Sequence, residues 1–112
     1  MINVKIFRND NSETVKFTVS GHAGYGPSGK DIICAAVSAI MYTAVGYCME
    51  IGYDGEFVED DGYASFTPAG GKSEDITLKA NAAMDAMCIG LKQIQESYGN
   101  RYIRIHELIQ EV

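Results

Sequence analysis

The chain has 112 residues, of which 46% are hydrophobic and 21% charged, so it is long enough to bury a core and too apolar to be disordered. Nine basic against fifteen acidic residues give a net charge of −6, which argues against a nucleic-acid surface and mildly favours a basic partner. Three cysteines without a C-x-x-C pair exclude a disulfide framework and a zinc ribbon. We expect one domain over residues 1–112.

The N-terminal residues lack the charged and then apolar pattern of a signal peptide, so we expect the reducing cytoplasm, where a free thiolate persists. The uncharged segment from Ile32 to Met49 just reaches the length of a membrane-spanning helix. It contains cysteine, serine, threonine, tyrosine and glycine, and much of its apolar content is alanine. We therefore expect a buried helix and no membrane partner.

The chain begins with two segments that alternate between core and surface residues. Ile2, Val4 and Ile6 alternate with their neighbours, and residues 15–20 repeat the pattern, which is typical of half-buried strands. The segment 9–12, Asn-Asp-Asn-Ser, is typical of a turn. The two segments predict a β-hairpin whose second strand ends just before His22.

Segment 20–38, SGHAGYGPSGKDIICAAVS, holds four of the twelve glycines, one of the two histidines and one of the three cysteines. If Asp31 caps a helix, Cys34 is the third helical residue, in the turn whose backbone N–H groups lack helical partners. The partial positive charge there favours a thiolate, and the same amides are suited to an oxyanion. His22 would take the thiol proton and return it to a leaving amine. Asp31 is either the helix cap or the residue that orients the imidazole.

The sequence Gly21-His22-Ala23, a short glycine-containing loop and then residues 31–38, DIICAAVS, resemble the signature of the ribosomal-processing cysteine proteases known as Prp. The length and the order of elements are similar over essentially the whole chain. The resemblance implies a cysteine endopeptidase that removes the N-terminal extension of large-subunit ribosomal protein 27 during ribosome maturation. It also implies a homodimer, and no cofactor or metal.

Carried over by position, the resemblance implies that Cys34 is the catalytic nucleophile and His22 the general base. Supporting roles fall to Gly21, Asp31 and Ser38. The loop 23–29 is expected to act as a lid that orders on substrate and brings His22 toward Cys34. Without substrate the two side chains are then expected to lie too far apart for a hydrogen bond.

A helix is predicted from about Asp31 to Ile51, with Gly52 as its stop. It carries small or apolar residues on almost every face, and such a helix must be covered on more than one side. A domain of this size has few other elements that could cover the helix on a second side. A second copy of the chain would supply the cover, which favours a homodimer.

Residues 56–60 and 63–67 flank Asp61-Gly62, a strong signal for a β-hairpin. Residues 68–72 are predicted to be a loop. A second helix follows from the Ser73 cap to Gly99, with one buried face, and residues 102–108 suggest a last strand. The hairpin is acidic, and we favour a solvated edge over a docking site for a basic peptide: Asp54, Glu56, Glu59, Asp60 and Asp61.

The order ββαββαβ predicts an α+β domain whose two helices cover one face of a mixed, largely antiparallel sheet. The last six elements also fit a split βαβ plan. Cys48 and Cys88 lie on apolar helical stripes and are predicted to be core residues.

Three other functions remain open at this stage. Gly24 to Lys30 matches the glycine and lysine spacing of a phosphate-binding loop, but Asp31 stands where Ser or Thr should bind magnesium. A ribosome-associated interaction module without catalysis is the second, and an RNA-binding sheet would need basic and aromatic residues that the acidic hairpin does not offer. The third is a metal site of His22, Cys34, Asp31 and His106, whose spacing fits no common zinc pattern.

Overall fold

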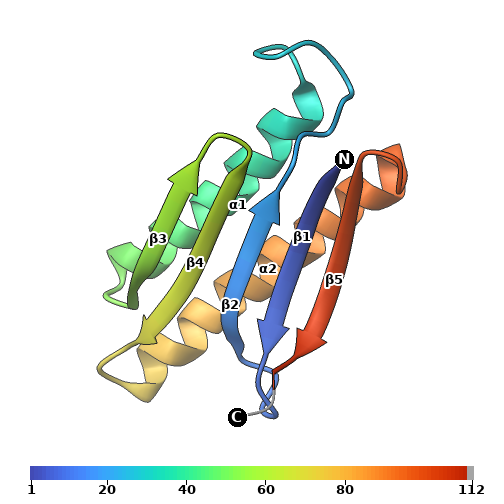
Figure 1. Cartoon of the computed structure of the whole chain (residues 1–112). Coiled ribbons are helices and arrows are strands. Elements are labelled where there is room, and N and C mark those ends of the chain that lie inside the picture. Colours follow the sequence, from blue (N-terminus) through green and yellow to red (C-terminus); the bar gives the residue numbers. More distant parts are fainter. Residues whose placement is uncertain (111–112) are drawn as a thin grey trace.

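The computed structural model describes residues 1–110, which form five strands and two helices in the order ββαββαβ. The strands form one face of the molecule and both helices lie behind it (Figure 1). The prediction of an α+β domain with two helices on one side of the sheet is confirmed. The bounds of the elements are β1 Ile2–Arg8, β2 Thr14–Ser20, α1 Ile32–Glu50, β3 Asp54–Asp60, β4 Tyr63–Gly70, α2 Glu74–Tyr98 and β5 Ile103–Ile109.

The sheet has the strand order β3-β4-β2-β1-β5. All neighbouring pairs are antiparallel except β1 and β5, which run parallel. The last six elements follow the split βαβ plan with one change, because β1 is inserted between β2 and β5. The insertion places the N-terminal strand in the interior of the sheet, where both of its edges are hydrogen-bonded.

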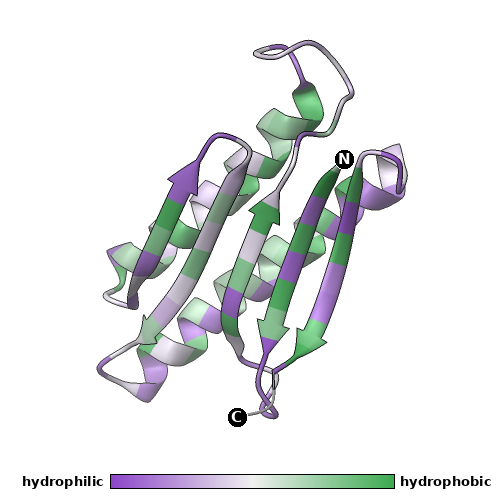
Figure 2. Cartoon of the chain, viewed as in Figure 1, coloured by the Kyte–Doolittle hydropathy of each residue, from purple (hydrophilic) through white to green (hydrophobic). Residues whose placement is uncertain are grey.

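The core lies between the sheet and the two helices. Hydrophilic and hydrophobic residues alternate along β1 (Figure 2), and Ile2, Val4 and Ile6 are at most 2% exposed. The predicted apolar stripe of α2 is buried from Ala80 to Leu91. Cys48 and Cys88 are buried, so their assignment to the core is confirmed.

The ends of both helices agree with the sequence signals. Asp31 is the N-cap of α1, and Gly52 follows its C-cap with φ +82°, a conformation that favours glycine. Ser73 caps α2 and accepts a hydrogen bond from the N–H of Ile76. Gly99 ends α2.

The prediction of a loop at residues 68–72 is wrong at its start, since β4 continues through Pro68 to Gly70. Proline lacks the N–H that a central strand needs. The pairing of β4 with β2 involves only Tyr63 to Phe66, so Pro68 has a strand partner on one side only, Gly55 of β3. An irregular register between Asp54 and Gly55 accompanies the change.

By length and composition α1 is the one helix of the described chain that is able to cross a membrane. In this fold it is a core helix, because one side of it packs into the domain: Ile33, Val37, Met41, Ala44, Val45 and Cys48 are buried.

Candidate active site

The start of α1 is held by the carboxylate of Asp31. Oδ1 accepts hydrogen bonds from the N–H groups of Ile33 and Cys34 at 3.0 and 3.1 Å. Oδ2 accepts from Tyr25 and Gly26 at 2.9 and 3.2 Å. Burial raises the pKa of this carboxyl, but the four backbone donors outweigh burial and hold the pKa below its ordinary value. Asp31 is therefore the helix cap, and it also fastens the glycine-rich loop to the helix.

The role of the helix amides differs from the one expected. The N–H groups of Ile33 and Cys34 donate to Asp31, so they do not face an oxyanion. The donor to the sulfur is instead the N–H of Ala23, which lies 3.4 Å from Cys34 Sγ. This contact places a backbone amide beside the atom that would carry out an attack.

Cys34 is half-buried, whereas Cys48 and Cys88 are at most 2% exposed. Burial raises the pKa of both core thiols, and Glu107 adds to the effect at Cys88. We predict that iodoacetamide near neutral pH alkylates Cys34 at least about ten times faster than either core cysteine. Peptide mapping by mass spectrometry after timed quenching measures the three rates, and equal rates would contradict an accessible, activated Cys34.

His22 reaches the site because Gly21 turns the chain at the end of β2. Gly21 has φ +91°, and a Cβ there would lie 2.3 Å from the carbonyl oxygen of Met1, so only glycine fits. The N–H of Gly21 donates to the carbonyl of Gly62 at 2.8 Å and ties this turn to the β3–β4 hairpin. The supporting position of Gly21 thus has a steric cause.

The imidazole of His22 faces the β3–β4 turn. Its Nε2 lies 3.8 Å from Asp61 Oδ1, and a Cβ on Gly62 would come within 2.9 Å of Nε2. Two-thirds of the His22 side chain is exposed. No hydrogen bond joins His22 to Cys34 among the described residues. Asp61 was assigned only to the acidic hairpin by sequence reasoning, because the pairing of β2 with β4 is what brings it to His22.

Two hollows of about 440 and 470 Å³ meet at this point. Both are lined by His22, Cys34, Ser38 and Asp61. The first runs between α1 and the β3–β4 hairpin, and the second runs under the loop 23–30. The two hollows therefore share the surface around Cys34 and His22.

Of the residues singled out from the sequence, the cleft brings together five and leaves out one. Gly21, His22 and Ser38 line it with Cys34, and Asp31 lines the second hollow. His106 lies on β5 beside Lys5 of β1 and lines neither hollow. Within residues 1–110 no group of three His, Cys, Asp or Glu side chains is placed to hold a metal, so the metal site is not supported.

The phosphate-loop interpretation is also not supported. The N–H groups of Tyr25 and Gly26, which a phosphate would need, donate to Asp31. The loop is also held by Tyr25, whose ring packs edge-on against Tyr98 and Tyr102 at centroid distances of 5.5 and 5.1 Å.

The fold, and a cleft with a thiol at a helix start and an imidazole on the adjacent turn, are compatible with a cysteine-type peptidase, and the comparison with known families shows that class. The chain belongs to the cysteine protease Prp family, whose family model matches residues 1–104. The resemblance stated from the signature is confirmed. The family acts in ribosomal processing, as the names of its members say.

Two relatives carry the name ribosomal processing cysteine protease Prp. The protein of Bacillus subtilis is 28% identical over 101 residues, with 88% of this chain and 90% of the relative covered. That of Staphylococcus aureus strain Mu50 is 27% identical over 113 residues, with 95% and 98% covered.

Two crystal structures of Prp from S. aureus are similar to this structure. In the first the protease is covalently linked to a product peptide, and the TM-score is 0.85 at 27% identity. The second holds a substrate peptide, with a TM-score of 0.79 at 26% identity. Each alignment covers 96% of this chain and 99% of the other.

Proposed function

We propose that this protein is a Cys/His endopeptidase that removes the N-terminal extension of large-subunit ribosomal protein 27 in the cytoplasm. The observation that carries the proposal is that Cys34 and His22 share the junction of the two hollows. The names of the S. aureus structures, which describe a substrate peptide and a covalently linked product peptide, add support.

In the proposed reaction Cys34 Sγ attacks the scissile carbonyl and forms a thioester, while the amine leaves with a proton from His22. Water then hydrolyses the thioester and frees the carboxylate and the thiol. His22 accepts and returns the proton, for which its ring must turn from Asp61 toward Cys34. Asp61, whose Oδ1 lies 3.8 Å from Nε2, is the proposed positioning residue for the imidazole. The N–H of Ala23, which donates to the reacting sulfur, is suited to the oxyanion.

The proposal is tested by intact-mass spectrometry of ribosomal protein 27 with its extension after incubation with wild-type protein and with His22→Ala. The wild type is expected to release the extension by a single cut, and the variant to leave the protein uncut. Uncut substrate with folded wild-type protein would refute this substrate. If the protein is instead an interaction module without catalysis, the wild type also leaves the substrate uncut. In that case cells that carry His22→Ala should behave like wild-type cells.

The cleft wall suggests which part of the substrate is bound. Glu59, Asp60 and Asp61 line the first hollow, and Tyr42 of α1 donates a hydrogen bond to Glu59 across it. Ribosomal proteins are basic, so these carboxylates are placed to meet a lysine or arginine near the cut. This position favours the docking role of the acidic hairpin over the solvated edge that the sequence favoured.

We predict that Asp60→Asn raises KM about two- to fivefold for a peptide with a lysine near the cut, because one exposed charge pair is lost. A peptide with norleucine at that position should show no change. Asp54→Asn is the matched control, because Asp54 lies on the same strand and lines neither hollow. Steady-state kinetics at low salt measure the difference, and equal effects of the two variants would contradict the docking role.

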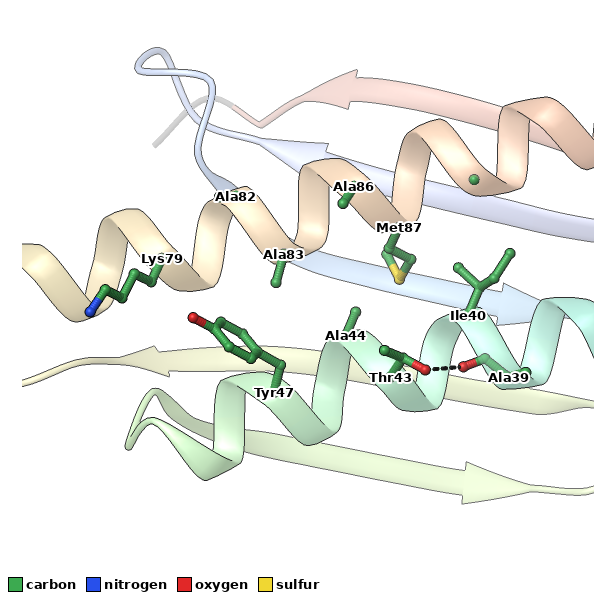
Figure 3. Close-up of a pocket in the computed structure, with 11 residues that line it drawn as sticks. Ala39, Ile40, Thr43, Ala44, Tyr47, Lys79, Ala82, Ala83, Ala86 and Met87 are labelled. Atoms are coloured by element: carbon green, nitrogen blue, oxygen red, sulfur yellow. Dashed lines mark hydrogen bonds between the residues drawn. The ribbon is translucent and has the colours of Figure 1, made fainter.

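The homodimer is proposed to form through the groove between α1 and α2. This groove of about 660 Å³ is lined by alanines of both helices, with Tyr47 and Lys79 at one end and Ile40 and Met87 at the other (Figure 3). Small side chains let a further helix approach closely. It lies on the side of α1 that this domain leaves uncovered, as the sequence pattern anticipated.

We predict that Ala86→Arg converts a dimer into a monomer, because the new charge would be buried at the interface. Multi-angle light scattering during size-exclusion chromatography measures the mass. Gln93→Arg, which is exposed on the same helix outside the groove, is the control and should remain dimeric. A wild-type monomer would refute the homodimer, and an Ala86→Arg dimer would place the interface elsewhere.

A further inference from the structure

The sheet has an open face, the side turned away from both helices (Figure 1). The strand pairing fixes its residues, because side chains alternate between faces and paired residues share one. Lys5 of β1 pairs with His106 of β5 and Thr18 of β2, on the face opposite to buried Val4 and Ile6. Across β5, β1 and β2 the open face is therefore made of three rows: Arg104-Asn3-Ser20, His106-Lys5-Thr18 and Leu108-Phe7-Lys16.

These rows are cationic in a protein of net charge −6. They hold Lys5, Lys16, Arg104 and His106 and no carboxylate. The acidic residues of the open face lie on β3, at Glu56 and Asp60, which the neutral strand β4 separates from β2. The composition and the acidic hairpin argued against a nucleic-acid surface. The strand order, however, puts the acidic residues of the open face at the β3 edge and the basic residues on β2, β1 and β5.

The cations of the open face are available to a ligand. Arg8, Lys79 and Lys92 each form an ion pair in the structure. Within residues 1–110 no carboxylate lies within 4.0 Å of the charged group of Lys5, Lys16 or Arg104. Lys5, Arg104 and His106 are exposed, and Lys16 is partly buried. Arg104 Nε donates a hydrogen bond to the carbonyl of Asn100 at 3.3 Å.

An aromatic ring completes the surface. Phe7 is partly exposed, and in the register of the sheet it lies between Lys16 and Leu108. A flat sheet that presents an aromatic side chain between cations is how several proteins stack an unpaired base while they hold the adjoining phosphates. An acidic polypeptide would use the charges but has no need of the ring.

We propose that the open face of β5, β1 and β2 binds single-stranded RNA, with Phe7 against a base and Lys5, Lys16 and Arg104 at phosphates. The row that contains Arg104 ends at Ser20, two residues before His22, so bound RNA would lie beside the peptide cleft. The proposal does not depend on peptidase activity.

Fluorescence polarisation with a fluorescein-labelled oligouridylate of about 12 nucleotides tests the proposal. Three phosphate contacts predict a log–log salt slope of about −2, which is a loss of affinity of about 20-fold between about 50 and 200 mM salt. Lys5→Gln/Arg104→Gln should reduce the slope to about −0.7. Phe7→Leu should weaken binding about fivefold or more without changing the slope.

Lys72→Gln/Lys92→Gln removes the same charge away from the open face and from the groove between the helices, and is the matched control, which should bind as the wild type does. Peptide cleavage should be unchanged in every variant, which verifies folding independently of RNA. Absence of binding at low salt would overturn the proposal. So would an equal loss in the control variant, or equally tight binding of labelled poly-glutamate, which would indicate an acidic polypeptide instead.

Discussion

Cys34→Ala is expected to lower kcat for extension removal by at least about 10³-fold while the protein stays folded, because the attacking atom is lost and little packing changes. Cys34 is half-buried, and its sulfur accepts one backbone hydrogen bond, from Ala23. Single-turnover cleavage of a peptide that spans the cut, together with thermal unfolding, measures both quantities. Removal of the nucleophile should leave only the catalysis that binding alone provides.

The control for this variant is Cys88→Ala, which removes a thiol from the core rather than from the cleft. Its activity should stay within about twofold of wild type, with a small loss of stability from the cavity. Cleavage by purified Cys34→Ala at the wild-type rate would exclude Cys34 as nucleophile. If Cys34→Ala and Cys88→Ala were equally inactive, the cause would be folding rather than chemistry.

Asp31→Ala is expected to destabilise the protein by about 2–4 kcal/mol, the sum of a lost helix cap and of lost charge-assisted hydrogen bonds to the loop. One carboxylate accepts four backbone hydrogen bonds here and is 9% exposed. Because those bonds position both Cys34 and the loop 23–30, activity should also fall at temperatures where the variant is folded. Chemical denaturation at neutral pH measures the loss of stability.

The pH dependence separates this role from a general effect of charge. The pKa of Asp31 is depressed in the folded state, so its charge contributes stability above the unfolded pKa of about 4, and this contribution is lost as pH falls through the folded pKa. The difference in stability between wild type and Asp31→Ala should be constant above about pH 5 and shrink below about pH 4. Asp10→Ala, at an exposed turn, should show no such difference. A pH-independent difference would contradict the cap.

The cleft has a simple physical origin. His22 follows the end of β2, and Cys34 lies in the first turn of α1. The loop between them is fixed at three points: the Asp31 carboxylate, the Ala23–Cys34 contact and the packing of Tyr25 on Tyr98 of α2 and on Tyr102 just before β5. The Gly21–Gly62 hydrogen bond ties the opposite wall of the cleft, the β3–β4 hairpin, to the turn that carries His22. The cleft is therefore made by packing between elements and not by any one of them.

Local signals in the sequence determined the elements and the family. Asp31 before an apolar run, Gly52 after it and Asp61-Gly62 between alternating segments are short-range signals, because caps and turns are decided by neighbouring residues. The family signature, on residues 21–38, lies within the same short range, and the match over residues 1–104 confirms it.

Only the tertiary structure decided what lies side by side from distant parts of the chain. Asp61 meets His22 because β4 pairs with β2, and Lys5 meets His106 because β1 is inserted beside β5. The helix amides that were predicted to bind an oxyanion donate to Asp31 instead. The same carboxylate also accepts hydrogen bonds from the N–H groups of Tyr25 and Gly26. Strand order is set by the packing of the whole sheet against both helices, and no local pattern of residues encodes it.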